Sequence, residues 1–300
     1  MANPLNREKL FPPEAVSDLY NRVVGESYLA KLSRQDPIKF NGNEFFTFNF
    51  DNEIDVVGES KPKSAGGISV DSIVIRPIKV EYSARVSIEF LKASQEKRIE
   101  ILKAFNDGYA KKLAKGFDLM ATHGVNPRTG KPSDIIAKNN FNDAVNQSVV
   151  YTAANPQLNI EDAIALIDGS DAETDGIALA PEVTSALSRV TLTGDPNGVR
   201  RYPEFEFGRV PDDLGAVRLV KSKNVSAYNN LKGLAGDFAG SFKWGVIDEI
   251  PLEIIPYGDP DGTGRDLARH NEILLRSETF LGWGILNPEA FAKITGGQDA

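Results

Sequence analysis

One unbroken alternation of apolar and polar residues constrains this chain more than any other feature. It reads IKVEYSARVSIEF and runs from Ile78 to Phe90. A period of two predicts a β-strand with one solvent-exposed face. At about 3.3 Å per residue the strand would span roughly 43 Å, whereas typical strands end after about five or six residues. The fold must therefore accommodate an unusually long strand.

A long amphipathic helix follows this strand. Apolar residues recur every three or four positions from Leu102 to Met120, and Ser94 and Gly124 suit its two ends. The helix would hold about 28 residues and measure about 42 Å, close to the length of the strand. Strand and helix together predict the backbone of an elongated subunit.

A second strand precedes the long one, with Phe46, Phe48 and Phe50 on one face. The intervening sequence GESKPKSAGGISVD carries a proline and two adjacent glycines, which are typical of a flexible bend. Residues 45–91 are therefore predicted to form one long hairpin. Its polar tip offers few large apolar side chains for burial, so we expect the exposed ladder to pair with another chain.

The N-terminal segment is predicted to be a polar arm over residues 1–13, followed by an amphipathic helix. Val16, Leu19 and Val23 belong to the apolar stripe of this helix. The stripe can pack on the subunit's own core or on a neighbouring subunit, and the sequence leaves both possibilities open.

The second half of the chain alternates short helical and extended patterns. Residues 125–158 are polar and rich in loop signals, whereas residues from about 150 to 250 predict a compact α/β unit. A polar loop covers about 257–271, and an extended segment closes the chain.

Composition narrows the possible functions. The chain has no cysteine and two histidines, so disulfides, thiolate chemistry and zinc sites are not expected. A net charge of −8 makes it a poor general binder of nucleic acid or anionic membrane. Neither a signal peptide nor a run of about 18 apolar residues is present, so no membrane span is predicted.

No motif supports an ordinary enzyme. The sequence DAETDGIALAPE, which starts at Asp171, places acidic residues near EF-hand positions, but Glu173 stands where Asp or Asn is required. Pro181 also breaks the exit geometry, so the segment is interpreted as a turn. GDPDGTG lacks the ending of a phosphate loop, and no serine lies in a Gly-x-Ser-x-Gly elbow. Trp244 and Trp283 are interpreted as core or interface packing.

The order of elements resembles that of the major capsid protein of tailed bacteriophages, which has the Hong Kong 97-type fold. Local matches are DVVGESKPKS at the hairpin tip, GIALAPEVTSAL and GDFAGSFKWGV in the compact unit, and the C-terminal RSETFLGWGILNPEAFAKI. The resemblance covers nearly the whole chain.

The resemblance implies an α+β fold with an N-terminal arm, a long extension-loop hairpin, a long spine helix, a peripheral domain and a compact axial domain. It divides the chain as follows: arm and helix 1–44, hairpin 45–91, spine helix and peripheral domain 92–150, axial domain 151–250, peripheral loop and strand 251–280, and C-terminal return to the axial domain 281–300.

As function, the resemblance implies a structural protein that assembles as pentamers and hexamers into an icosahedral shell around double-stranded DNA. Its partners would be its own copies, a portal protein and DNA bound without sequence-specific contact. No cofactor and no metal are implied. Some relatives carry an N-terminal scaffolding segment that is removed on maturation. Its lack here implies a separate scaffolding protein or prior processing. The protein would assemble in the host bacterial cytoplasm and end in the capsid of the virion.

Two alternatives stay open. An encapsulin-like nanocompartment shell shares the fold, and enzyme cargo instead of DNA would identify it. A soluble metal-dependent enzyme using the acidic loops would be a stable monomer with bound metal.

Two sets of site residues follow from the resemblance. Intersubunit contacts are expected at the hairpin tip, the N-terminal stripe and the peripheral loop, namely Glu59, Lys61, Pro62, Lys63, Val16, Leu19, Val23, Arg265 and Arg269. Some family members join subunits by an isopeptide bond between a lysine and an asparagine, assisted by a glutamate. Lys61, Asn271 and Glu278 match that pattern. The alternative is that Glu278 forms an ion pair with a basic residue and that no cross-link forms.

Overall fold

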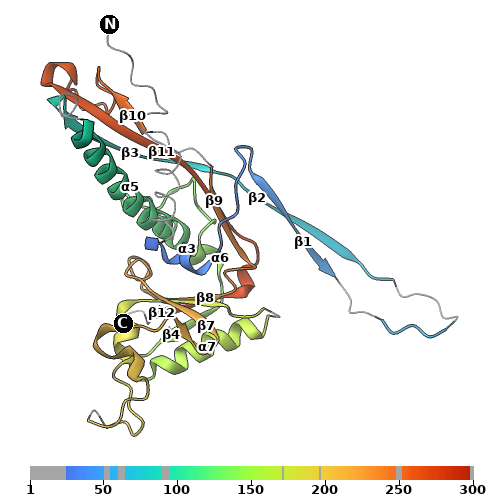
Figure 1. Ribbon diagram of the computed structural model, residues 1–300. Coiled ribbons are helices and arrows are strands. Elements are labelled where there is room, and N and C mark those ends of the chain that lie inside the picture. Colours follow the sequence, from blue (N-terminus) through green and yellow to red (C-terminus); the bar gives the residue numbers. More distant parts are fainter. Residues whose placement is uncertain are drawn as a thin grey trace.

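The computed structural model describes residues 25–50, 55–59, 65–89, 95–170, 172–195, 197–247 and 252–297. Figure 1 shows three parts: a projecting hairpin, a long helix lying along a sheet, and a compact unit below them. The helix and sheet will be called the peripheral unit, and the compact part the axial unit.

The projecting hairpin pairs β1 (Asn43–Phe50) with β2 (Ile68–Ile75) in antiparallel register. It extends well away from the rest of the chain (Figure 1). The hairpin predicted over 45–91 is thus shorter than expected, because the long strand is not its second arm. Pro77 follows β2 and cannot donate a ladder hydrogen bond, which explains the break before the next strand.

The long strand instead belongs to the peripheral sheet. β3 (Ile78–Ser87) pairs with β11 (Glu272–Ile285), and β10 (Leu252–Ile255) and β9 (Phe242–Val246) also pair with β11. β3 ends at Ser87, before Phe90, which lies outside the described residues. One strand from the C-terminal third of the chain therefore organises this sheet.

The predicted spine helix is confirmed as α5 (Gln95–His123), with 29 residues. Leu102 packs with Ile273 and Leu275 of β11, and the Tyr109 hydroxyl lies 2.6 Å from Oγ1 of Thr279. Gly124 follows with a φ of +67°, as a helix end in the left-handed region requires.

The axial unit contains a six-stranded sheet with the order β4-β12-β8-β5-β7-β6. Helices α7 (Pro156–Asp168) and α8 (Pro181–Leu187) pack on it, and the 3-10 segment η1 (Pro203–Gly208) packs against α8. The strands are β4 (Ser148–Tyr151), β5 (Gly176–Leu179), β6 (Asp213–Leu214), β7 (Val217–Lys221), β8 (Leu231–Gly236) and β12 (Phe291–Gly296).

One strand lies in a different unit from the one expected. β9 was expected in the compact unit, but Trp244 pairs with Trp283 of β11 in the peripheral sheet. β12 returns from the C-terminal end into the axial sheet, as the resemblance implied for the end of the chain. The segment 125–158, expected as loop, contains β4 and the short helix α6 (Phe141–Ala144), which Asn140 caps.

An aromatic core joins the units. Trp244 and Trp283 are buried, as predicted, and Phe117 of α5 lies 5.1 Å from Trp244 between ring centroids within the peripheral unit. Phe141 of α6 lies 5.1 Å from Phe242 of β9 and 5.0 Å from Phe291 of β12, so it connects the peripheral sheet to the axial sheet. Such rings bury large apolar areas, so the units form one body.

Candidate intersubunit surfaces

The projecting hairpin leaves an apolar face uncovered. Phe46, Ile68 and Val74 lie on the same face by register, and they are 58%, 55% and 45% exposed. A two-stranded hairpin is marginally stable in water by itself, and its free edges invite pairing. This face therefore fits burial against another chain.

The base of the hairpin packs on glycines of β11. A Cβ at Gly284 would lie 2.7 Å from Cγ1 of Ile75, and a Cβ at Gly282 would lie 2.9 Å from Cδ1 of Ile38. These contacts decide where the hairpin leaves the body. The sequence LGWGI could have indicated this packing, because glycine within a strand often marks the close approach of another segment.

Part of the predicted contact set lies outside the described residues. This holds for Val16, Leu19 and Val23 and for Lys61, Pro62 and Lys63. Glu59 is described and exposed near the hairpin tip. The predictions for these residues stay predictions.

The peripheral loop after β10 is organised by Arg85 of β3. Its guanidinium donates to Asp259 at 3.0 Å, to Oδ2 of Asp261 at 2.8 Å and to Glu272 at 3.2 Å. It also donates to Oγ1 of Thr263 at 2.7 Å. The Arg85 guanidinium holds the pKa of the Asp261 carboxyl well below its usual range. Five donors in a planar fork suit this multiple pairing, so the loop is fixed within the subunit.

This loop presents the two predicted arginines. Arg265 pairs with Glu272 at 2.7 Å and is 53% exposed, and Arg269 is exposed on the 3-10 segment η2 (Ala268–His270). Arg85 was missed at the sequence level, because its partners follow it by more than 170 residues.

The suggested cross-linking residues do not meet within one subunit. Asn271 is exposed at the start of β11, and Glu278 lies seven residues further along the extended strand, about 23 Å away at 3.3 Å per residue. The Glu278 carboxylate pairs with Lys79 at 2.7 Å. Among the apolar residues Ile273, Leu274 and Leu275, which lie between Asn271 and Glu278, Ile273 and Leu275 pack with Leu102 of α5. Leu274 alone shares the face of Glu278.

The acidic turn before β5 holds Asp175, whose carboxylate binds backbone amides. Asp175 accepts hydrogen bonds from the amides of Phe238 at 2.7 Å and Ala239 at 2.8 Å, which agrees with a turn rather than a calcium loop. Within the described ranges, no three His, Cys, Asp or Glu side chains gather as metal ligands. Among the same residues, no helix is long and apolar enough to cross a membrane.

A buried carboxylate joins three segments of the chain. Asp118 of α5 accepts from Ser27 Oγ at 2.5 Å and from Asn224 Nδ2 at 2.7 Å, and the amides of Tyr28 and Leu29 lie at 3.3 and 3.4 Å. Burial raises the pKa of Asp118 to about 7, although the bonds from Ser27 and Asn224 oppose the shift. Asp118 thereby ties α3 (Tyr28–Leu32) and the 224 loop to the spine helix.

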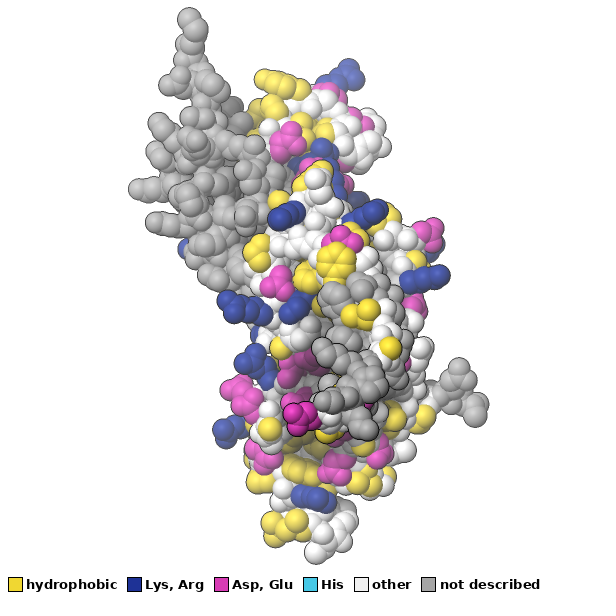
Figure 2. Space-filling model, turned by 90° about the vertical axis from the view of Figure 1, so that its right-hand side faces the viewer, with side chains coloured by type: hydrophobic (Ala, Val, Ile, Leu, Met, Phe, Trp, Pro, Cys, Tyr) yellow, Lys and Arg dark blue, Asp and Glu magenta, His cyan; other side chains and the backbone are white. Residues whose placement is uncertain are grey.

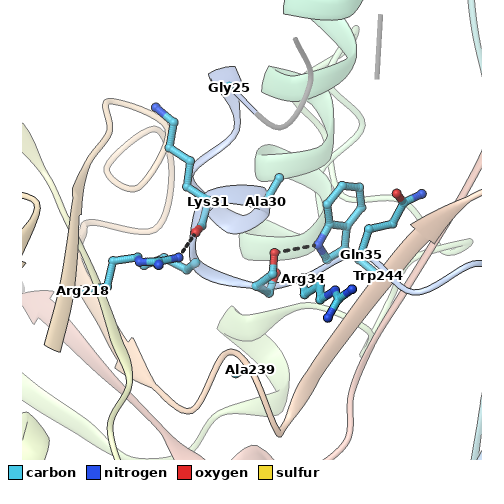
Figure 3. Close-up of a pocket in the computed structure, with 10 residues that line it drawn as sticks. Gly25, Ala30, Lys31, Arg34, Gln35, Arg218, Ala239 and Trp244 are labelled. Atoms are coloured by element: carbon cyan, nitrogen blue, oxygen red, sulfur yellow. Dashed lines mark hydrogen bonds between the residues drawn. The ribbon is translucent and has the colours of Figure 1, made fainter. Parts of the chain in front are cut away.

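A groove beside α3 is shown in Figure 3, with Lys31, Arg34, Arg218 and Trp244 among its lining residues. Arg218 donates to the carbonyl oxygen of Lys31 at 2.9 Å, and Trp244 Nε1 lies 3.5 Å from the carbonyl oxygen of Ser33. Both side chains thus fasten the α3 segment to the two units, which gives the groove a structural role.

Solved structures of phage proteins share this fold. A chain from Mycobacterium phage Ogopogo aligns with a TM-score of 0.74 and 29% identity, covering 91% of this chain and 92% of that chain. A chain from Gordonia phage Cozz gives 0.76 and 21%, covering 91% and 87%. A chain from the "Capsid of empty GTA particle computed with C5 symmetry" gives 0.62 and 13%, covering 91% and 90%.

These matches confirm the predicted resemblance to phage major capsid proteins and the α+β capsid fold. The scan against protein-family models and the search of curated proteins find no match.

Proposed function

We infer that the chain is a phage major capsid protein with the Hong Kong 97-type fold, and we propose that its copies assemble as pentamers and hexamers into an icosahedral shell. The observation that carries this proposal is the projecting hairpin with its exposed apolar face, on a chain whose fold matches phage capsids over 91% of its length. A hairpin of this kind needs a partner surface, and a neighbouring copy supplies one.

The peripheral loop supplies a second contact. Because Arg85 fixes this loop within each subunit, Arg265 and Arg269 are presented in a defined geometry. We place them at contacts between copies near threefold and quasi-threefold axes, as the family resemblance implies.

Further partners follow from the resemblance. A separate scaffolding protein and a portal protein take part in assembly, which takes place in the host cytoplasm. Double-stranded DNA is packaged inside without sequence-specific contact. A net charge of −8 supports this assignment, because an acidic wall repels phosphate and does not grip the genome tightly.

The role is structural. Likeness to capsid proteins supports a non-enzymatic function, and the carboxylates discussed above are engaged in caps and ion pairs.

Assembly of the full-length chain tests the proposal. Expression with its scaffold should give closed shells in negative-stain and cryo-electron microscopy, and particles from infected cells should contain DNA. A stable monomer under all conditions would contradict the proposal, and shells filled with an enzyme would identify the nanocompartment alternative.

A further inference from the structure

Helix α7 of the axial unit presents an uncovered face. Leu158, Glu161, Asp162 and Leu166 recur at helical spacing and are all exposed, while Ile160 and Ile167 on the opposite side are buried. The helix has no lysine or arginine. These four exposed residues will be called the α7 face, which combines two leucines with two carboxylates.

A second uncovered surface surrounds Phe207. This side chain is fully exposed, and its backbone has a φ of +54°, an uncommon conformation for a bulky residue. The turn is held by the Arg209 amide, which donates to the Glu206 carbonyl oxygen at 3.1 Å, and by Lys221 Nζ, which donates to the Gly208 carbonyl oxygen at 3.0 Å. The fold thus fixes an aromatic ring in an outward position.

Two further apolar side chains belong to this surface. Leu192 and Val199 are 66% and 72% exposed and are joined by a backbone hydrogen bond of 3.0 Å. Arg200 links them to the Phe207 turn through its contact with Glu206 at 3.7 Å. Exposed arginines accompany the apolar residues, and the exposed carboxylates Asp195, Asp212 and Asp213 lie in the same stretch of the chain. The arginine face is defined as Leu192, Val199, Arg201, Phe207 and Arg209.

The two faces occupy different ends of one sheet. α7 packs against β12 and β4, and β4 is one edge strand, whereas Lys221 ends β7, which lies beside the other edge strand, β6. Figure 2 shows hydrophobic and acidic side chains mixed on the lower part of the molecule, where the axial unit lies. Two different surfaces at opposite ends of a unit allow head-to-tail association, which forms a ring when the rotation closes.

We propose that the α7 face of one copy docks against the arginine face of the next copy, which joins axial units head to tail around the centre of a capsomer. The inference rests on the proposed function and names the partner surfaces within it. Charge complementarity supports a second copy as the occupant, because Glu161 and Asp162 can meet Arg201 and Arg209. The leucines and Phe207 supply apolar area for burial, and the charges supply register and specificity.

A charge swap in the full-length chain tests the pairing. Glu161→Arg with Asp162→Arg, and separately Arg201→Glu with Arg209→Glu, should each lower the yield of sedimenting shells at least about tenfold, because like charges face each other. All four changes in one chain should restore assembly. Arg201→Lys with Arg209→Lys keeps the charge and should assemble like the native chain.

Engineered cysteines test the head-to-tail geometry, since the native chain has none. Shells made from equal amounts of a Leu158→Cys chain and a Phe207→Cys chain should give covalent dimers with a short bismaleimide. Shells of either chain alone should give none, because the two positions meet only each other.

The outcomes separate this inference from the proposed function. If native chains form shells but the charge variants also assemble normally, the pairing is wrong and the capsid function stands. The same holds if dimers form only in shells made from one cysteine variant alone and not in the mixed shells. If native chains form no shells at all, the proposed function itself fails. Where a charge variant does not fold, judged by circular dichroism, the cysteine dimers decide.

Discussion

Gly284 on β11 leaves room for Ile75 at the base of the projecting hairpin. A Cβ at position 284 would lie 2.7 Å from Cγ1 of Ile75 and 2.9 Å from its Cδ1. Ile75 is buried, so it fixes the point at which the hairpin leaves the body. The direction in which the hairpin projects therefore depends on the lack of a side chain at position 284.

We expect Gly284→Ala to lower stability and to impair assembly. Overpacking a buried contact typically costs about 1–3 kcal/mol, and relief requires movement of the hairpin base. Thermal unfolding and shell yield both measure the effect. Gly108→Ala in α5 is the matched control, since nothing lies within 4 Å of its Cβ and alanine favours a helix by up to about 1 kcal/mol. An unfolding temperature equal to that of the native chain would contradict the role of Gly284.

Phe46→Ser combined with Val74→Ser should abolish shells without unfolding the subunit. Both side chains are about half exposed in the single chain, at 58% and 45%, so their loss mainly removes burial that occurs between copies. Each large apolar side chain contributes about 1.5–3 kcal/mol when fully buried. Glu44→Ser, on the same face of the hairpin, is the control and should assemble. Normal shells from the double variant would show that this face is not an assembly surface.

Replacing Arg85 should loosen the peripheral loop selectively. Arg85→Lys keeps the charge but cannot span Asp259, Asp261 and Glu272 at once, because a lysine ammonium is a point donor. Hydrogen exchange across residues 256–271 should become faster, while α5 keeps its protection. Arg128→Lys, at an exposed position, should change neither. Equal exchange in the native chain and Arg85→Lys would show that the loop is held by other contacts.

Stability should fall as pH rises from about 4 to about 7 because of Asp118. Burial raises the pKa of this carboxyl from 3.8 to about 7, so the folded state binds a proton that the unfolded state has lost. The contribution is fully present below pH 4, declines up to pH 7 and is absent above it. A shift of this size corresponds to roughly 4 kcal/mol.

Asp118→Asn should flatten that part of the pH profile of thermal unfolding, because the amide does not ionise. Asp162→Asn, at an exposed position on α7, should leave the profile as it is. Identical pH profiles for the native chain and Asp118→Asn would contradict the assignment.

Local signals predicted the parts of the fold that depend on neighbouring residues. The apolar spacing from Leu102 to Met120 and the glycine at 124 gave α5 its correct length and end. The alternation from Ile78 identified β3 as a strand, but its partner could not be predicted. β3 pairs with β11, nearly two hundred residues later, whereas hairpin logic favours the nearest strand.

The features that the sequence did not predict depend on contacts between residues far apart in the chain. Arg85 looked like an ordinary polar position in an alternating strand, and Asp118 like an ordinary polar position in a helix. Their importance comes from Asp259, Asp261, Ser27 and Asn224, which the fold alone brings to them. Composition and periodicity carry no information about such convergence.

Mature particles boiled in detergent should give a single band near 32.7 kDa, without a ladder of covalent oligomers. An isopeptide bond needs a neutral lysine amine, an asparagine carboxamide and a carboxylate that accepts a proton. Here Asn271 and Glu278 lie about 23 Å apart along β11, so no single subunit can present both to Lys61. Glu278 is also held by Lys79 at 2.7 Å, so its carboxylate is already paired within the subunit. Lys79→Ala frees Glu278 and should still give one band, since the separation from Asn271 is unchanged. A ladder in native particles that disappears in Lys61→Ala and in Asn271→Ala would establish the cross-link and would require Glu278 to act from another subunit.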